Sequence, residues 1–275
     1  MTPPAATTDS VRFEFGANWS RFIDCVDQRR IEAAEESLVQ MTGSADAIRG
    51  RTFLDAGSGS GLFSLGAARL GAARVHSFDY DANSVAATAE IKRRFGPPEV
   101  AWTVERGDIL DRPYVASLGK WDVVYSWGVL HHTGRMWQAI ANACDLVADD
   151  GVLFIAIYND QGRKTRLWMK IKRLYSANAV GRAAVLATFI PYWTMRGAVG
   201  DLLRLRNPVR RYRDYRSERG MSIHHDWIDW LGGYPFEAAS PEAVFRFVAN
   251  RGFSLRNLAT SSGSWGCNQF VFDRR

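Results

Sequence analysis

A run of alternating glycines constrains the fold of this chain more than any other feature. Gly57, Gly59 and Gly61 follow an apolar, strand-like run at 52–54, and a helical pattern begins at Leu62. Glycine adopts positive φ angles without a steric penalty, so a strand, a glycine-rich turn and a helix start bring backbone close to a nucleotide-like ligand. A dinucleotide fingerprint requires a further glycine where Leu62 stands, which argues against NAD as that ligand. The stretch therefore predicts an α/β fold with a ligand site at this turn.

Two acids accompany the turn. Asp55 lies two residues before the first glycine, and Asp79 follows a second strand-like run at 73–78. An acid about 20 residues beyond such a turn, at the tip of the second strand, is placed to accept hydrogen bonds from two ribose hydroxyls. Each acid also has a structural interpretation, because Asp is favoured at helix N-caps and either Asp79 or Asp81 could cap the following helix.

Three further segments extend the pattern. They are a third-strand segment at 104–111, a fourth strand at 121–126 that runs into two histidines, and a fifth strand at 152–157 after a turn at 149–151. In this order, the D-x-G-x-G-x-G turn and the later segments resemble the class I S-adenosylmethionine (SAM) methyltransferases over residues 50–160. SAM carries an amino acid group and a sulfonium but no phosphate, so a carboxylate beside the turn suits it.

The resemblance implies SAM as the cofactor and a role for several side chains. Asp79 would hold the ribose, Asp108 would accept a hydrogen bond from the adenine amino group, and Ile109 would pack on the adenine ring. The expected cofactor-binding residues are Asp55, Gly57, Gly59, Gly61, Asp79, Tyr80, Asp108, Ile109 and Ser126.

The resemblance also implies the architecture, a Rossmann-like seven-stranded α/β sheet with helices on both faces. We expect an N-terminal helical segment or cap at 1–49 and the SAM-binding core at 50–160. A basic helical insertion or lid at 161–235 would follow the fifth strand, and the last helix and a C-terminal strand hairpin would occupy 236–275.

Local signals mark the helices at the two ends of the chain. A helical pattern runs from about Arg21 to Met41. Ser240 and Pro241 form an N-cap and a first-turn proline, and Gly252 is placed to end that helix. Strand-like runs follow, from Phe253 to Leu258 and from Gln269 to Phe272, which predicts the antiparallel hairpin.

The basic charge of the chain belongs to one segment. Residues 160–220 hold fifteen Lys or Arg against four Asp or Glu, a net charge of +11 where the whole chain has +6. The segment also contains an uncharged run from Ala183 to Met195, interrupted by Pro191, which is too short to span a bilayer. This pattern suits contact with a membrane surface or a lipid-linked substrate, a lid over an anionic substrate, or a helical subdomain with a solvated basic face. Nucleic acid is the least favoured partner.

The cysteines and the N-terminus indicate a compartment. Cys25, Cys144 and Cys267 are odd in number and far apart, as expected for free thiols in a reducing environment. The first residues lack the basic and apolar regions of a signal peptide. We therefore expect a cytoplasmic protein, with peripheral contact at the inner membrane surface as an extension of that expectation; the oligomeric state stays open.

Methyl transfer to a hydroxyl requires in-line positioning and a base. His131 and His132 follow the fourth strand at the carboxyl edge of the sheet, where ligands of open α/β sheets bind, and a histidine is a suitable base there. The resemblance aligns His132 with the recurrent histidine of the family; the alternative is that His132 is structural. A second set of polar and aromatic residues is expected to contact the acceptor: Trp19, Tyr158, His224, His225, Tyr234 and Glu237. No H-x-x-x-H or similar spacing occurs, so no metal site is expected.

These features predict a SAM-dependent methyltransferase that acts on oxygen, with a small-molecule or lipid-linked hydroxyl acceptor such as a phenol, quinol or sugar. The chain is loosely similar to the ubiquinone-pathway O-methyltransferases and to relatives that methylate sugars or secondary metabolites. No N-P-P-Y-like tetrad follows the fourth strand, where Ser126-Trp127-Gly128-Val129 stands, which disfavours amino methylation of DNA bases or protein glutamine. N- or C-methylation of a small metabolite and a non-catalytic SAM-binding module remain as alternatives.

Overall fold

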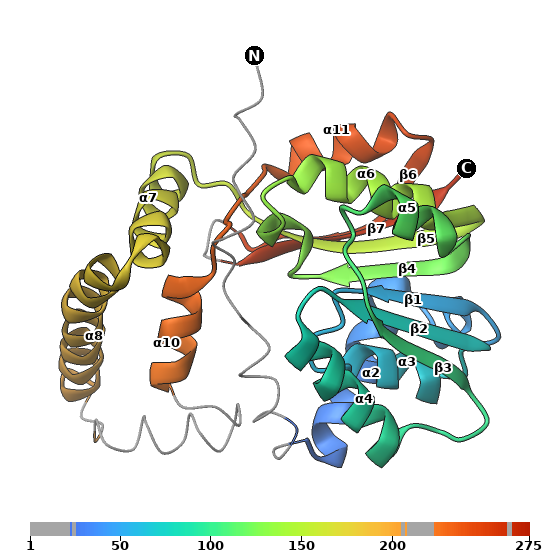
Figure 1. Ribbon diagram of the computed structural model, residues 1–275, viewed down its shortest axis with the longest axis horizontal. Helices are drawn as coiled ribbons and strands as arrows, with labels where there is room; N and C mark the ends of the chain where they lie inside the picture. Colours follow the sequence, from blue (N-terminus) through green and yellow to red (C-terminus); the bar gives the residue numbers. More distant parts are fainter. Residues whose placement is uncertain (1–22, 24–25, 205–206, 208–222, 263–265) are drawn as a thin grey trace. The chain divides into compact units, whose positions relative to one another are not determined.

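The structure is a computed structural model that describes residues 23, 26–204, 207, 223–262 and 266–275. Its centre is a seven-stranded sheet with the strand order β3-β2-β1-β4-β5-β7-β6 (Figure 1). The first five strands are parallel, and β7 runs antiparallel between β5 and β6. The strands are β1 (Thr52–Ala56), β2 (Arg74–Asp79), β3 (Ala101–Arg106), β4 (Trp121–Trp127), β5 (Val147–Tyr158), β6 (Phe253–Ala259) and β7 (Cys267–Arg274).

Helices cover both faces of this sheet (Figure 1). Helices α2 (Gln28–Thr42), α3 (Leu62–Arg69) and α4 (Ala82–Phe95) pack on one face, and α5 (Arg112–Ser117), α6 (Met136–Leu146) and α11 (Pro241–Ala249) on the other. Successive residues of the central strands point to opposite faces of the sheet. Phe53 packs in the core under α2, α3 and α4, and Leu54 packs in the core under α5, α6 and α11. Burial on both faces explains why these strands are continuous apolar runs rather than alternating ones. The predicted fold class is confirmed.

Several element boundaries differ from the sequence expectations. Helix α2 begins at Gln28, because Asp27 caps it by accepting a hydrogen bond from the Arg30 N–H at 3.0 Å. Strand β5 begins at Val147, so the expected turn at 149–151 lies inside the strand as an irregularity, with Asp150 at φ 58°. The register against β4 shifts there, between Trp121 and the next paired residue. A turn signal can therefore mark a bulge as well as a strand end.

The end of the chain folds as predicted. Ser240 caps α11, and its side chain accepts a hydrogen bond from the Ala243 N–H at 3.2 Å. Gly252 follows that helix with φ 85°, a conformation that favours glycine. Strands β6 and β7 then form the antiparallel hairpin.

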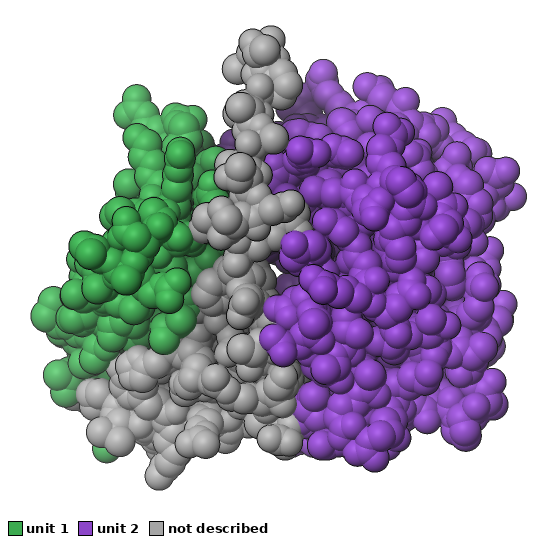
Figure 2. All heavy atoms as spheres, viewed as in Figure 1, with its two compact units in different colours: residues 1–13, 162–236 green, residues 14–161, 237–275 purple. Residues whose placement is uncertain are grey.

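The chain divides into two compact units (Figure 2). Residues 14–161 and 237–275 form the unit that contains the sheet, and residues 162–236 belong to the other. The second unit holds α7 (Arg163–Ala177), α8 (Ala179–Leu202) and α10 (Ile223–Gly232), and we call it the helical unit. Helix α8 continues through Pro191, which removes only one backbone N–H donor from a helix of 24 residues. Among the described residues, no helix is both long and apolar enough to cross a membrane.

The helical unit has a core of its own. Tyr175, Val185 and Leu231 are buried together, and several aromatic side chains pack around them. The Trp168 ring lies 4.1 Å from the Trp230 ring, centroid to centroid, in an edge-on arrangement. Since the three helices share this cluster, the insertion is a folded subdomain.

Candidate active site

The glycine-rich turn joins β1 to α3 and requires its glycines. Gly57, Gly59 and Gly61 have φ angles of 84°, 55° and 80°. A Cβ atom on Gly57 would lie 2.4 Å from Cγ1 of Val129, and one on Gly61 would lie 2.8 Å from Cγ2 of Thr88. Any larger residue at these two positions would collide with the packed side chains, so the turn requires glycine. It lies at the carboxyl edge of the parallel strands, where ligands of such sheets bind.

Asp79 ties the end of β2 to this turn. Its Oδ2 accepts a hydrogen bond from the Gly59 N–H at 3.0 Å, and its Oδ1 accepts one from the Asp81 N–H at 2.9 Å. Burial raises the pKa of Asp79 above its usual value, although the backbone N–H donors oppose that shift. A carboxylate has about four acceptor sites, so Asp79 retains capacity for a ligand hydroxyl beyond its backbone donors Gly59, Tyr80 and Asp81. Of the two candidate caps for α4, Asp79 and Asp81, the cap is Asp81, which accepts a hydrogen bond from the Asn83 N–H at 2.8 Å.

Asp55 lies beneath the turn and is only 2% exposed. Its Oδ2 accepts a hydrogen bond from the Ser64 hydroxyl of α3 at 2.5 Å. Burial raises the pKa of Asp55 to about 7, the Ser64 hydrogen bond lowers it, and the negative charge of Asp79 raises it. Asp55 does not cap α3, whose N-cap is Gly61.

The remaining expected cofactor residues surround this turn in different environments. Asp108 follows β3 and accepts a hydrogen bond from the Leu110 N–H at 2.8 Å, and Tyr80 is exposed beside Arg106, whose Nε donates to the Tyr80 carbonyl. Ile109 is buried in the core that contains α5 and α6, and Ser126 is buried and donates a hydrogen bond to the Ala56 carbonyl at 2.7 Å.

The two histidines follow β4 in a short 3-10 turn, η3 (Leu130–His132). His131 is fully buried and His132 is half-buried. The His131 ring lies 4.1 Å from the Tyr158 ring at the end of β5, and the His132 ring lies 5.6 Å from it. Burial raises the pKa of Tyr158, so its hydroxyl stays protonated at neutral pH. The structure thus brings together three of the residues that the sequence singled out.

Glu237 joins this group from a distant part of the chain. Its N–H donates to the His131 carbonyl at 2.9 Å, and its Oε2 accepts from the Met136 N–H at the start of α6 at 2.8 Å. Burial raises the pKa of Glu237, and the backbone donors of Met136 and Gly134 lower it. Glu237 therefore fixes the segment that carries the histidines; its expected contact with the acceptor stays a prediction.

The other expected acceptor residues either lie outside the described residues or belong to the helical unit. Trp19 lies outside the described residues. His224 and His225 belong to α10, but their side chains lie outside the described part of the chain. Tyr234 is half-buried in the segment after α10, in the helical unit. Within the described residues, no group of three or more His, Cys, Asp or Glu side chains is arranged to hold a metal ion.

Sequence reasoning missed the residues that close the turn from outside. Thr88 of α4 donates a hydrogen bond to the Gly59 carbonyl at 3.2 Å, and its Oγ1 lies 2.9 Å from the Ser58 hydroxyl. Val129 packs against Gly57 from the loop after β4. Neither Thr88 nor Val129 belongs to a recognisable sequence motif. The glycines at 57 and 61 are the available sequence signal that neighbouring side chains pack closely on the turn.

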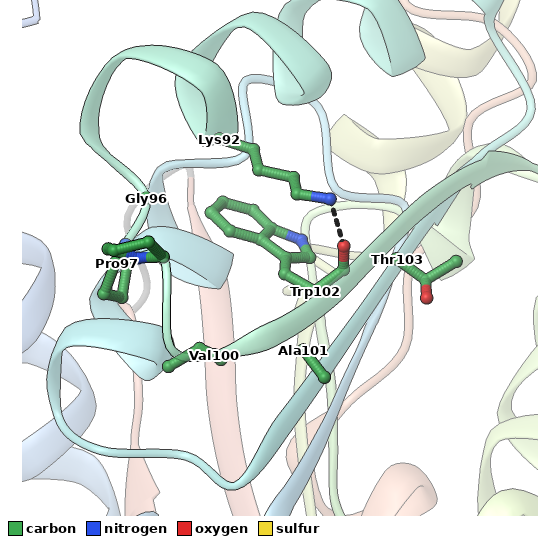
Figure 3. Close-up of a pocket in the computed structure, with 8 residues that line it drawn as sticks. Lys92, Gly96, Pro97, Val100, Ala101, Trp102 and Thr103 are labelled. Carbon is green, nitrogen blue, oxygen red and sulfur yellow. Dashed lines mark hydrogen bonds between the residues drawn. The ribbon is translucent and has the colours of Figure 1, made fainter.

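A separate hollow lies far from this group along the strands. It lies between the end of α4 and the start of β3, where the Lys92 ammonium donates to the Trp102 carbonyl (Figure 3). Residues 100–103 line it at the amino end of β3, so it opens at the edge opposite the glycine-rich turn. It belongs to neither the cofactor turn nor the histidine segment.

Comparison with known proteins finds a methyltransferase domain in part of the chain. Residues 54–153 match the family model of a methyltransferase domain. A comparison with curated protein sequences finds no match. Among solved structures, the chain is similar to magnesium protoporphyrin IX methyltransferase (ChlM) from Synechocystis PCC 6803 with bound SAH, at 16% identity and a TM-score of 0.55 over 94% of each chain. It is also similar to the N-methyltransferase NodS from Bradyrhizobium japonicum WM9 in complex with SAH, at 13% identity and a TM-score of 0.51, over 95% of this chain and 99% of that one.

The family match places a methyltransferase domain at residues 54–153, and the strand order of the sheet is the one typical of class I SAM-dependent methyltransferases. SAM, the expected cofactor, is bound in a structure of ChlM that is similar to this chain at 14% identity, with a TM-score of 0.53. The residues present fit that cofactor, because carboxylates that can accept hydrogen bonds from ribose hydroxyls stand at the ends of β1 and β2, beside the glycine-rich turn. When bound, SAM supplies a methyl group activated by its sulfonium.

Proposed function

We propose that the protein methylates a hydroxyl group of a small-molecule or lipid-linked acceptor, with His132 as the general base. One observation carries this proposal. Val129 packs on the glycine-rich turn, and its carbonyl accepts a hydrogen bond from the His132 N–H at 2.8 Å. The histidine segment is therefore attached directly to the residue that contacts the cofactor turn.

The two histidines differ in a way that supports separate roles. His131 is fully buried, packs on Tyr158 and is held through its carbonyl by Glu237. His132 is half-buried, so it is the more accessible of the two histidines. Because the methyl group is already activated, the protein has only to hold the acceptor in line and remove its proton. We assign the proton removal to His132 and the support of its ring to His131 and Tyr158.

A nitrogen acceptor is the second candidate. NodS is named an N-methyltransferase, and an amine is a nucleophile once it is neutral, so such a reaction depends less on a base. Methylation of carbon, or SAM binding without catalysis, are the further alternatives.

A screen with methyl-labelled SAM tests the proposal. The purified protein is incubated with metabolite and lipid extracts, and labelled products are identified by mass spectrometry. An O-methylated product that forms with the wild type and much less with His132→Ala supports the proposal. An N- or C-methylated product, or none in any extract, contradicts it.

We further propose that the helical unit contacts an anionic membrane surface, which would give access to a lipid-linked acceptor. Among the described residues 162–204, every exposed charged side chain is basic, and Asp201, the acid in this range, is buried at 5% exposure. Exposed apolar side chains alternate with these charges. On α7, Leu167 and Leu174 are 57% and 51% exposed and lie on the same stripe as Lys170.

Helix α8 carries the larger apolar stripe. Tyr192, Met195, Val199 and Leu202 follow the spacing of one helix face and are 48%, 64%, 50% and 61% exposed. Exposed apolar residues beside basic ones are typical of elements that lie in a membrane interface. Arg196 is exposed on the same half of the helix and Arg204 is exposed just beyond its end, so charge complementarity favours anionic lipid.

A further inference from the structure

A row of four buried polar side chains runs beneath the cofactor turn. Asp55 of β1, Ser64 of α3, Ser77 of β2 and Trp102 of β3 lie in the same layer, between the sheet and helices α2 to α4. The Trp102 Nε1–H donates to Ser77 Oγ at 2.8 Å, the two serine hydroxyls lie 2.7 Å apart, and Ser64 Oγ donates to Asp55 Oδ2 at 2.5 Å. The four side chains are 5%, 0%, 0% and 2% exposed, in the order from Trp102 to Asp55.

When Asp55 is ionised, the chemistry of the two ends fixes the direction of every hydrogen bond in this row. An indole N–H can only donate, so Ser77 accepts from Trp102. Ser64 donates its one proton to Asp55, so the proton between the serines must come from Ser77. All donors therefore point toward Asp55.

From this geometry we propose that Trp102 is a positioning residue for the cofactor site, which acts through Ser77 and Ser64 to hold Asp55 as an ionised acceptor. Without the indole donor, nothing prevents the Ser77 hydroxyl from acting as the acceptor in its hydrogen bond with Ser64. Ser64 could then donate to Ser77 instead and leave Asp55 without its hydrogen bond. Successive hydrogen bonds also polarise one another, which strengthens the last bond of the row.

The surroundings of Asp55 explain why it needs this support. Its carboxylate is buried, and the charge of Asp79 at the end of β2 opposes its ionisation. Tyr125 of β4 is the other titratable group that interacts with it, and burial and the charge of Asp55 raise the pKa of the Tyr125 hydroxyl far above its usual value. Neither neighbour stabilises a negative charge on Asp55, so within the described residues the Ser64 hydrogen bond is the favourable contribution.

The inference rests on the proposed role of Asp55 at the cofactor, because an ionised carboxylate attracts the cationic groups of SAM. It predicts that SAM affinity rises with pH as Asp55 ionises, near pH 7. Removing the Ser64 hydrogen bond to the Asp55 carboxylate should shift the ionisation equilibrium of Asp55 by roughly tenfold or more. Weakening that hydrogen bond through the row should shift the same equilibrium by about two- to threefold.

The experiment is calorimetric titration of SAM into the full-length protein between pH 5 and pH 9. At pH 6 we expect about tenfold weaker binding in Ser64→Ala and about two- to threefold weaker binding in both Trp102→Phe and Ser77→Ala, with affinities that converge on the wild type at pH 9. Trp121→Phe is the matched control, because Trp121 is also a buried indole, but it donates to the Leu118 carbonyl in the other core. Its pH profile should match the wild type.

Two further variants separate the possible failures. In Ser64→Ala/Trp102→Phe, the second substitution should add nothing to the shift, because the row is already broken. A Trp102→Phe profile that coincides with the wild type overturns the inference. If Asp55→Asn itself binds SAM with unchanged affinity and pH dependence, the role of Asp55 at the cofactor is wrong and the inference falls with it. Far-UV circular dichroism establishes that each variant is folded.

Discussion

At the scale of single residues, Asp79 combines two tasks. Its carboxylate holds the glycine-rich turn through the Gly59 N–H, and we assign it the ribose hydroxyls of SAM. The same side chain therefore holds the turn in place and puts a negative charge beside it. Asp79 can reach the turn because it lies at the end of β2, the strand next to β1 in the sheet.

Asp79→Ala should weaken SAM binding at least tenfold. Each lost charge-assisted hydrogen bond contributes roughly 1.5–3 kcal/mol before water compensates, and 1.4 kcal/mol corresponds to a tenfold change. Calorimetric titration with SAM measures the effect. Asp81→Ala is the matched control: it removes the cap of α4 and costs about 1 kcal/mol of stability, but should leave SAM affinity within about twofold. Equal affinities in the two folded variants would reject the ribose assignment.

His132→Ala should lower turnover by about 10²–10⁴ and leave SAM affinity nearly unchanged, because general base catalysis contributes on that scale. His131→Ala should have a smaller effect on turnover but should destabilise the protein, since His131 is fully buried against Tyr158. Steady-state kinetics on the identified acceptor, with added imidazole to rescue His132→Ala, measure both. Near-full activity in both variants would show that neither histidine is the base.

Which residues the sequence could predict follows from how local their signals are. The positive φ angles at Gly57 and Gly61 are backbone requirements, so the residue type alone reports them. The partnership of Ser64, Ser77 and Trp102 depends on three elements that meet only in the folded sheet, and none of these residues is unusual where it stands. Glu237 is a similar case, because its contact with the histidine segment joins positions about a hundred residues apart.

At the scale of elements, the turn between β1 and α3 is the most constrained part of the molecule. A residue other than glycine at position 57 meets two separate obstacles, a positive φ angle and the Val129 side chain. These obstacles can be separated by experiment, because other glycines of the chain face only the first of them.

Gly57→Ala should weaken SAM binding by more than tenfold and lower the free energy of unfolding by about 2 kcal/mol, since strain and overpacking add. Gly119→Ala is the control: Gly119 has φ 70°, but a Cβ there would meet nothing within 4 Å. It should cost about 1 kcal/mol and leave SAM affinity unchanged. The double variant Gly57→Ala/Val129→Ala should recover part of the affinity. No recovery would show that the backbone strain alone is responsible. Urea unfolding and calorimetry provide the two readouts.

The stripes on α7 and α8 make the membrane proposal testable. The wild type should co-sediment with vesicles containing anionic phosphatidylserine at low salt and less at high salt, because each basic side chain adds roughly 1 kcal/mol and salt screens it. Tyr192→Ser/Met195→Ser/Val199→Ser should bind at least tenfold less, through lost apolar burial. The control Phe245→Ser/Leu258→Ser changes exposed apolar side chains of the sheet unit, 41% and 40% exposed, and should bind normally. Equal sedimentation with neutral and anionic vesicles would exclude the proposal and favour a small soluble acceptor.

The helical elements show the limit of sequence patterns most clearly. Composition alone reveals the basic segment and its apolar run. It does not reveal that α8 continues through Pro191, because a proline in the sequence does not show whether packing keeps the helix continuous. Part of the basic segment, including Arg210, Arg211 and Arg213, lies outside the described residues. The residues at 149–151 predict a turn before the fifth strand, but they form an irregularity inside β5. Gly and Asp are common in turns and in bulges, so the residue types do not distinguish the two.

At the scale of the whole molecule, each of the two units is held together internally, by cores of unequal size. The sheet unit has an extensive core on each face, whereas the helical unit has a small aromatic one. That small core also contains a buried ammonium: Lys172 is 2% exposed and donates a hydrogen bond to the Trp230 carbonyl. The Lys172 ammonium lies 4.7 Å from the Trp230 ring centroid and 5.1 Å from that of Phe236.

The stability of the helical unit should depend on pH through this lysine. Burial lowers the pKa of Lys172 to about 7, while the unfolded chain keeps a value near about 10.4. Between these values the unfolded state binds a proton that the folded state does not, so the free energy of unfolding rises with pH by roughly 1.4 kcal/mol per unit. Urea unfolding followed by tryptophan fluorescence between pH 7 and pH 10 should show this slope in the wild type and a much smaller one in Lys172→Met. Parallel profiles in the two proteins would contradict it.

The position of β7 in the sheet has a consequence for how the chain is made. Tyr158 at the end of β5 pairs with Cys267, so the neighbour that β5 requires is translated 109 residues later. At roughly 5–20 residues per second, the ribosome needs about 5–20 s to deliver it. During that interval β5 is the edge of a nascent five-stranded sheet, and its free backbone groups can pair with another polypeptide. Each round of synthesis therefore passes through a stage of several seconds in which aggregation competes with completion, and chaperone access to the nascent chain matters most at that stage.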